Sequence, residues 1–134
     1  MPSIFTRIIQ GEIPCYRIAE NDSFMAFLDV FPLVRGHVLV VPKLEIDRLF
    51  DVPDDLLNEW LVFAKPIAKA IERAFPCRRV GISVIGLEVP HAHMHLVPLQ
   101  SADDLNFTKD KMTLSQEELL VDQKLILTHL VHSD

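Results

Sequence analysis

Residues 88–99, read as EVPHAHMHLVPL, place three of the six histidines of the chain at alternate positions among apolar residues. A period of two is the side-chain period of a β-strand. We therefore expect His91, His93 and His95 to project from one face of a strand, about 7 Å apart because a strand rises about 3.3 Å per residue. The fold must then supply a sheet that is polar on one face at this point and apolar on the other. The residues expected on the apolar face are Ala92, Met94 and Leu96.

Three interpretations of the row of histidines remain open on the residues alone. A polar strand face is one, although three buried imidazoles cost free energy unless each is hydrogen-bonded. A zinc site is the second; two histidines spaced HxH can supply two ligands, but the third is too distant and a remote ligand is required. Nucleophilic catalysis is the third, because neutral imidazole is a nucleophile and a neighbouring ring can orient it or supply a proton.

Length and charge limit the class of protein. A chain of 134 residues predicts one domain, residues 1–134. The net charge of −6 argues against binding to a nucleic acid polymer, which needs a basic face. The sequence has no run of about 18 apolar residues that would predict a membrane span, and its first residues do not resemble a signal peptide. Cys15 and Cys77 form no CxxC pair, which favours reduced thiols in a cytoplasmic protein.

The sequence predicts one long helix in the middle of the chain and another helix near its end. Apolar residues at three- and four-residue steps predict a long helix over residues 54–75, with a bend at Pro66. The capping-box sequence that begins at Ser115 predicts a last helix running toward His132. The apolar stripe of the long helix consists of Leu57, Trp60, Leu61, Ala64, Ile67, Ala68, Ile71 and Phe75.

The remaining pattern predicts an α+β fold, with antiparallel strands in meander order and helices on one face of the sheet. A short helix over residues 4–10 is capped by Ser3 and ends at Gly11. The expected strands are residues 16–18, 24–29, 37–42, 79–85 and 92–98.

Two segments resemble one known family. Residues 91–97, HAHMHLV, match His-φ-His-φ-His-φ-φ, where φ is apolar, the defining motif of the histidine triad (HIT) family of nucleotide hydrolases and transferases. Residues 4–43, IFTRIIQGEIPCYRIAENDSFMAFLDVFPLVRGHVLVVPK, resemble the N-terminal half of the same family. The motif-bearing part is thus residues 4–99, and residues 100–134 form a C-terminal extension. The resemblance implies a HIT-like antiparallel sheet with one long helix packed on it, and a homodimer in which two sheets join edge to edge.

The resemblance also implies roles for the histidines. His93 corresponds to the nucleophile that attacks the α-phosphorus of a nucleotide. His95 corresponds to a residue that contacts the phosphate. His91 orients the ring of His93, partly through its backbone carbonyl, and His37 matches a fourth histidine near the row.

Other positions correspond to a nucleotide pocket. Asp29 matches an acid that accepts hydrogen bonds from the ribose hydroxyls. In the loop before the histidines Val89 keeps its place, but Leu87 and Glu88 stand where the family usually has polar neutral groups, and the family's asparagine is missing. The apolar positions that sandwich the base correspond to Ile4, Phe5, Phe27, Leu28 and Val30.

The implied function is hydrolysis of nucleoside phosphoramidates or related purine nucleotide phosphoesters, with a small-molecule nucleotide as the partner and no metal or cofactor. Two alternatives stay open. The Leu87 and Glu88 changes favour a nucleotide-binding module with little turnover. The three histidines also allow a metal-binding protein.

Overall fold

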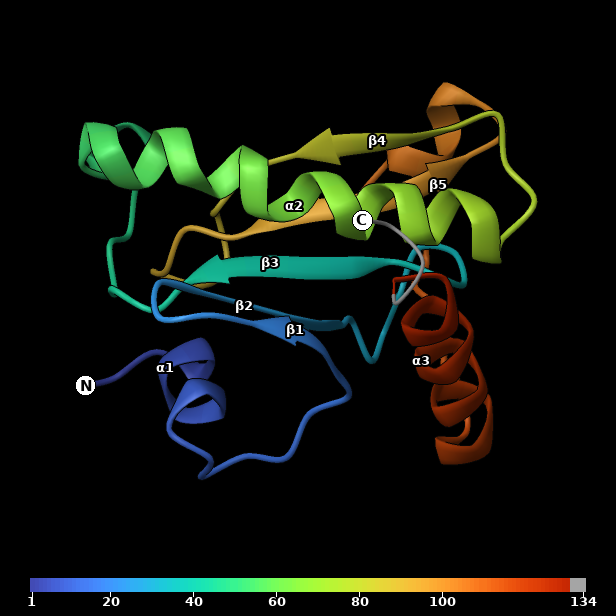
Figure 1. The fold of residues 1–134 in the computed structure, drawn as a ribbon, viewed down its shortest axis with the longest axis horizontal. Helices are drawn as coiled ribbons and strands as arrows, with labels where there is room; N and C mark the ends of the chain where they lie inside the picture. Colours follow the sequence, from blue (N-terminus) through green and yellow to red (C-terminus); the bar gives the residue numbers. More distant parts are fainter. Residues whose placement is uncertain (131–134) are drawn as a thin grey trace.

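The computed structural model describes residues 1–130, so the end of the last predicted helix, toward His132, lies outside the described residues. The helices are α1 (Ile4–Ile9), α2 (Asp54–Ala74) and α3 (Gln116–Leu130), with the short 3-10 helices η1 (Leu49–Asp51) and η2 (Ala102–Leu105). The strands are β1 (Arg17–Glu20), β2 (Phe24–Leu28), β3 (Val38–Pro42), β4 (Arg79–Ser83) and β5 (Met94–Leu99). Figure 1 shows α2 lying along the sheet, with α1 and α3 near its lower part.

All strand pairs are antiparallel, which confirms the α+β prediction. The order in the sheet is β1-β2-β3-β5-β4, so the predicted meander is broken only between β3 and β4, while β4 and β5 are neighbours as predicted. The prediction that the helices lie on one face is wrong for α1, which covers the face opposite α2. The chain crosses through α2 to the far edge as β4, and β5 then returns to pair with β3. This order sets Leu39 of β3 opposite His95 of β5.

The sheet carries a separate apolar cluster on each face. The first cluster contains Ala92, Met94 and Leu96 together with the buried residues of α2, which confirms the apolar face predicted for this segment. The second cluster lies under α1 and contains Phe5, Met25, Phe27, Leu39 and Val41. The histidines share this second face, as the ring contact between Phe5 and His93 shows.

The strand predicted over residues 92–98 begins two residues later than expected, at Met94. The amide of Ala92 donates to the carbonyl of Ile46 at 2.7 Å instead of joining the sheet ladder. His91 and His93 therefore lie in a buried loop that leads into β5, held by a contact with another loop.

The long helix α2 begins and ends close to the predicted bounds, and Trp60, Ile67 and Ile71 of its stripe are buried. Leu61 is the exception, since 55% of it is exposed. Leu61 lies at the margin of the apolar arc and lines an open groove together with Val80 and Ile82 of β4. Within the described residues, no helix combines the length and hydropathy needed to cross a membrane.

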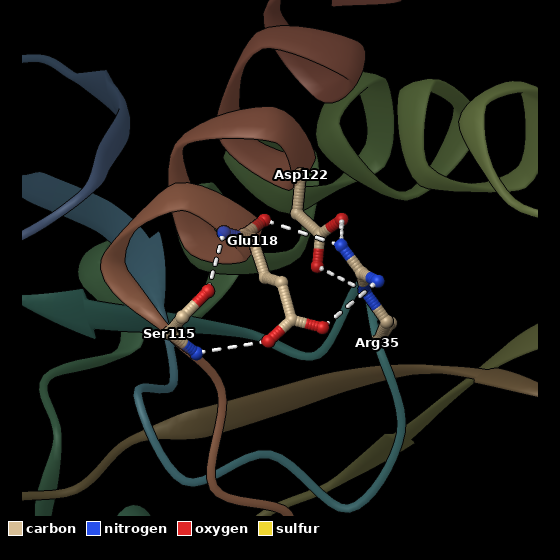
Figure 2. A network of polar contacts seen from close by, with 4 residues as sticks. All are labelled: Arg35, Ser115, Glu118 and Asp122. Carbon is tan, nitrogen blue, oxygen red and sulfur yellow. Dashed lines mark hydrogen bonds and ion pairs between the residues drawn. The ribbon is translucent and has the colours of Figure 1, made fainter.

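Polar contacts hold α3 to the loop before β3 (Figure 2). The predicted capping box is confirmed: the amide of Glu118 donates to Oγ of Ser115, and the Ser115 amide donates to Oε1 of Glu118. The Arg35 guanidinium donates to both carboxylate oxygens of Asp122, at 3.0 and 2.8 Å. Asp122 is buried, and its partner Arg35 precedes His37 by two residues in the sequence. The pair therefore holds α3 against the loop that leads to His37.

Candidate functional site

Four histidines meet on the face of the sheet that carries α1. His37 directly precedes β3, His95 lies in β5, and His91 and His93 lie in the loop between β4 and β5. All four are at least 93% buried. The ring centroid of His95 lies 4.9 Å from that of His93 and 5.1 Å from that of His37. The fold thus brings His37, remote in sequence, to the row, as the resemblance to the HIT family implied.

Burial keeps the imidazoles of His37, His93 and His95 uncharged. It lowers the pKa of His37 to about 3 and the pKa of His95 to about 4, because a buried site disfavours the charged ring. Burial also lowers the pKa of His93, against the opposing effect of its hydrogen bond to the His91 carbonyl. At pH 7 each of the three rings is therefore neutral, with one protonated and one bare nitrogen.

The hydrogen bonds of His37 assign the proton positions in two rings. The Leu33 amide donates to Nδ1 of His37 at 3.1 Å, so the proton of His37 is on Nε2. That Nε2 lies 2.9 Å from Nδ1 of His95 and donates to it. The proton of His95 must then be on its Nε2. His95 consequently has an N–H donor on the nitrogen that does not contact His37.

His93 has the reverse arrangement. Its Nδ1 lies 2.8 Å from the carbonyl oxygen of His91, and a carbonyl oxygen only accepts. The proton of His93 is therefore on Nδ1, and Nε2 carries a free lone pair. A bare ring nitrogen beside a ring with an N–H donor is suited to attack an electrophile and to stabilise or protonate what departs.

His91 is held at both ring nitrogens. Nε2 lies 2.7 Å from the carbonyl of Pro42, and Nδ1 lies 2.7 Å from Oγ of Ser3. Among residues 1–130 no buried side-chain nitrogen or oxygen lacks a hydrogen-bond partner. The polar face is therefore internally satisfied, which removes the free-energy objection to burying the histidines.

Asp29 directly follows β2 and lies beside the histidines. Its Oδ2 is 3.7 Å from Nε2 of His37, and its Oδ1 accepts from the Phe31 amide at 3.0 Å. Burial raises the pKa of Asp29 to about 6, although the Phe31 amide and the Lys111 charge oppose the rise. Asp29, His37 and His95 also offer three potential metal-ligand atoms that lie within 4.8 Å of one another.

The apolar positions predicted to hold a base divide between the two faces of the sheet. Phe5 and Phe27 are buried together on the histidine face, with ring centroids 5.9 Å apart. Ile4 and Val30 are 47% and 41% exposed, at the surface. Leu28 contradicts the prediction, because it packs in the cluster under α2. Strand alternation explains this result, since Leu28 and its neighbour Phe27 must point to opposite faces.

The loop before the histidines places its unusual residues at the surface. Leu87 is 89% exposed, and Glu88 is also exposed. Val89 is half-buried against the second cluster. The negative charge of Glu88 nevertheless acts on the site. It favours the protonated forms of Asp29 and His93, and so it contributes a rise to the pKa of each.

The C-terminal extension contributes residues that the sequence reading missed. The ring of Phe107 packs edge-on against His95, with centroids 4.5 Å apart, and its centroid lies 6.2 Å from that of His37. The Lys111 charge acts on Asp29 and on both of these histidines. The lone phenylalanine in the otherwise polar stretch after β5 was the available signal for this contact.

Comparisons with known proteins agree with this arrangement. The HIT domain matches residues 10–102. Adenosine 5′-monophosphoramidase HNT1 of Saccharomyces cerevisiae is 36% identical over 96 residues, which cover 71% of this chain and 61% of that protein. A HIT-like protein involved in cell-cycle regulation from Bartonella henselae has a TM-score of 0.82 at 28% identity, with 95% of each chain covered.

A Zn-bound histidine triad family protein from Mycobacterium smegmatis has a TM-score of 0.81 at 27% identity, covering 96% of this chain and 93% of that one. The family match spans more than half of the sequence and includes both the histidine row and β1 to β5. The chain therefore belongs to the HIT family.

Proposed function

We propose that the protein hydrolyses nucleoside phosphoramidates or related nucleotide phosphoesters through a covalent intermediate on His93. The observation that carries the proposal is the proton assignment of the site. The His91 carbonyl holds the proton of His93 on Nδ1, at 2.8 Å, and so leaves Nε2 as a free nucleophile. The name of the yeast relative, adenosine 5′-monophosphoramidase, supports this class of substrate.

The reaction has two displacements at phosphorus. In the first, Nε2 of His93 forms a bond to the α-phosphorus, the bond to the leaving amine or oxygen breaks, and the leaving group takes a proton. The N–H of His95 is the proposed source of that proton or of a hydrogen bond to the phosphate. In the second, water attacks the phosphorus and gives a proton back to Nε2 of His95, the bond to Nε2 of His93 breaks, and a nucleoside 5′-monophosphate is released.

The remaining pocket residues are proposed to bind the nucleotide. The Asp29 carboxylate suits the two ribose hydroxyls, because a carboxylate accepts from a vicinal diol. Phe5, Phe27, Ile4 and Val30 supply apolar surface for the base. The positive charge of Lys111 favours a phosphate near His95.

Intact-mass spectrometry of a quenched reaction tests the mechanism. Wild-type protein mixed with adenosine 5′-phosphoramidate should gain the mass of an adenylyl group, and His93→Ala should not. His93→Ala should also lose turnover by many orders of magnitude while it keeps most of its nucleotide affinity, because the nucleophile makes few ground-state contacts. Turnover of His93→Ala at the wild-type rate would falsify the proposal.

The same experiment distinguishes hydrolysis from the alternative function, a nucleotide-binding module with little turnover. It predicts that AMP raises the melting temperature of the wild type, while no adduct and no cleavage are detected.

A metal-binding function is the second candidate, favoured by the convergence of Asp29, His37 and His95. In the structure the facing nitrogens of His37 and His95 share a proton at 2.9 Å, so a cation would have to displace it. Near-stoichiometric zinc in the purified protein, lost in His37→Ala, would support this candidate over hydrolysis without metal.

We also propose that the protein is a cytoplasmic homodimer. Support for the dimer comes from β4, an edge strand of the sheet, and from an apolar groove of about 540 Å³ beside it. Fractionation of cells that express the tagged protein tests the location.

A further inference from the structure

A polar cluster adjoins the ring of His91. It consists of Ser3, Thr6 and Glu45, which surround Nδ1 of His91. The Ser3 hydroxyl lies 2.7 Å from that nitrogen, and the Thr6 hydroxyl lies 3.4 Å from it. Oε1 of Glu45 accepts from the Ser3 amide and from the Thr6 hydroxyl, both at 2.6 Å. The reaction proposed above uses none of these three residues.

The donor and acceptor count gives the cluster a direction. The Thr6 amide donates to Oγ of Ser3 at 3.1 Å, as expected for the N-cap of α1. The single proton of the Ser3 hydroxyl is then free to donate to Nδ1 of His91. The opposite ring nitrogen, Nε2, donates to the carbonyl of Pro42 at 2.7 Å. Both ring nitrogens are thus held, one from α1 and one from the end of β3.

We propose that Ser3, Thr6 and Glu45 are positioning residues for the nucleophile. They hold the ring of His91, and through the backbone of His91 they hold the carbonyl that keeps the proton of His93 on Nδ1. Glu45 is the anchor, because it fixes the Ser3 amide and the Thr6 hydroxyl at the start of α1. The inference rests on the nucleophilic role proposed for His93.

The chemistry of the cluster suits a fixed support. The hydrogen bonds from the Ser3 amide and the Thr6 hydroxyl lower the pKa of Glu45 to about 2, so the carboxylate stays ionised at every pH at which the enzyme is expected to work. Ser3 and His91 are buried, and the carboxylate is exposed at the outer end of the network. Removal of the Glu45 side chain therefore leaves the core intact and loosens only the network.

The position of the His91 carbonyl matters because the neutral imidazole of His93 has two tautomers, with the proton on Nδ1 or on Nε2. Without a well-placed acceptor at 2.8 Å, neutral His93 can move its proton to Nε2, and the lone pair then points away from the phosphorus. Small displacements of a reacting group lower rates steeply, since the attack needs a near-ideal approach.

The test combines the ring ¹⁵N chemical shifts of the histidines with steady-state kinetics of the full-length protein. A protonated ring nitrogen and a bare one have well-separated shifts. In wild type, His93 should show a protonated Nδ1 and a bare Nε2. In Glu45→Ala and Ser3→Ala, His93 should show averaged shifts, and kcat for adenosine 5′-phosphoramidate should fall by about tenfold with KM unchanged.

Two further variants separate positioning from general destabilisation. Glu45→Gln keeps an acceptor oxygen for the Ser3 amide and the Thr6 hydroxyl, so it should retain the wild-type His93 shifts and most of kcat. Glu59→Ala removes an exposed carboxylate from α2 and should change neither readout. Since Ser3 also caps α1, Glu45→Ala carries the decision if Ser3→Ala folds poorly.

Unchanged His93 shifts in Glu45→Ala, or an unchanged kcat, would overturn the positioning role. The shifts are measured without substrate, so they decide the inference even if wild type shows no phosphoramidase activity. Absence of phosphoramidase activity in wild type would contradict the proposed function, while the ¹⁵N shifts would still decide whether Glu45 and Ser3 control the tautomer of His93.

Discussion

At the residue scale, backbone groups set the proton positions of the site. The Leu33 amide fixes the tautomer of His37, which in turn fixes His95, and the His91 carbonyl fixes His93. Among residues 1–130 the recorded hydrogen bonds that order these three rings come from an amide, a carbonyl and a neighbouring ring, and Glu45 acts on them only through His91. The charged residues around the pocket are therefore available to tune ligand affinity, and two of them lead to predictions.

The carboxylate of Asp29 should make nucleotide affinity depend on pH. Its pKa of about 6 means that it is ionised above pH 6 and accepts from both ribose hydroxyls, whereas protonation at lower pH removes an acceptor. At about pH 7.5, well above that value, AMP should bind about tenfold more tightly than 2′,3′-dideoxy-AMP, which is the effect expected of hydrogen bonds to a charged group. The ratio should fall toward unity as pH falls through 6.

Isothermal titration with both nucleotides measures this ratio. The phosphate of AMP also titrates in this range, but the dideoxy nucleotide shares that phosphate and cancels its contribution. Asp29→Asn should give a small ratio that does not change with pH. A ratio in wild type that is independent of pH contradicts the assignment of Asp29 to the ribose.

Glu88 should weaken phosphate binding from its place at the rim. Its exposed charge raises the pKa of Asp29 and acts on His93, so it also repels a phosphate there. Glu88→Gln should tighten AMP binding by roughly two- to fivefold at about 10 mM salt, and by much less at about 1 M salt, where the Debye length is about 3 Å. Glu117→Gln, an exposed change on α3, serves as the control. Equal affinity of Glu88→Gln and wild type at low salt would show that this carboxylate is too distant to matter.

At the element scale, α3 is attached to the site by one buried ion pair. The Arg35 guanidinium contacts both oxygens of Asp122 and also reaches the carbonyl and carboxylate of Glu118. The side chain of Asp122 is only 3% exposed, so little water can replace the hydrogen bonds from Arg35. The pair links the first turns of α3 to the loop that carries His37 into the site.

Removal of Arg35 should therefore destabilise the fold strongly. Arg35→Ala leaves a buried carboxylate unpaired and should lower the free energy of unfolding by about 3 kcal/mol. Lys109→Ala breaks an ion pair whose partners are both largely exposed, and it should change the free energy of unfolding far less than Arg35→Ala does. Urea denaturation compares the two variants. Asp122→Asn in the Arg35→Ala background should recover part of the loss, and its failure to do so would argue against the unpaired charge as the cause.

At the scale of the whole molecule, the two faces of the sheet serve different purposes, and the edge strand β4 lies beside an apolar groove. The histidine site occupies the face under α1, and the main core fills the face under α2. Leu61, Val62 and Ile82 line the groove between α2 and the edge strand β4, and they are 55%, 70% and 45% exposed. An exposed edge strand with an apolar neighbour is a surface that another sheet can extend.

The dimer prediction is tested on this surface. Ile82→Glu places a charge in the groove, and it should turn a dimer into a monomer by multi-angle light scattering, with little change in the melting temperature of the monomer. Phe50→Glu alters another exposed apolar side chain, outside the groove, and should leave the mass unchanged. A wild-type protein with the mass of one chain at micromolar concentration contradicts the prediction outright.

Features that depend on local chemistry were predictable from the sequence. The alternation in residues 91–96 separates imidazoles from apolar side chains on any strand or extended segment, whatever its neighbours are. The bounds of α2 and the Ser115–Glu118 capping box follow from contacts three and four residues apart. The resemblance to the HIT family then supplied roles for residues that no pattern could distinguish.

Contacts between distant residues were decided only by the tertiary structure. The resemblance placed His37 near the row, but its direct contact with His95 arises because β5 returns between β3 and β4, a step that the predicted meander order did not contain. Leu61 matches the apolar period of α2 and is still exposed, because its place is at the open groove beside β4. Glu45 and Phe107 reach the histidines from loops without any periodic signal. Periodicity states which face a residue occupies, but the partner across that face depends on strand order and loop paths, which arise from the packing of the whole chain.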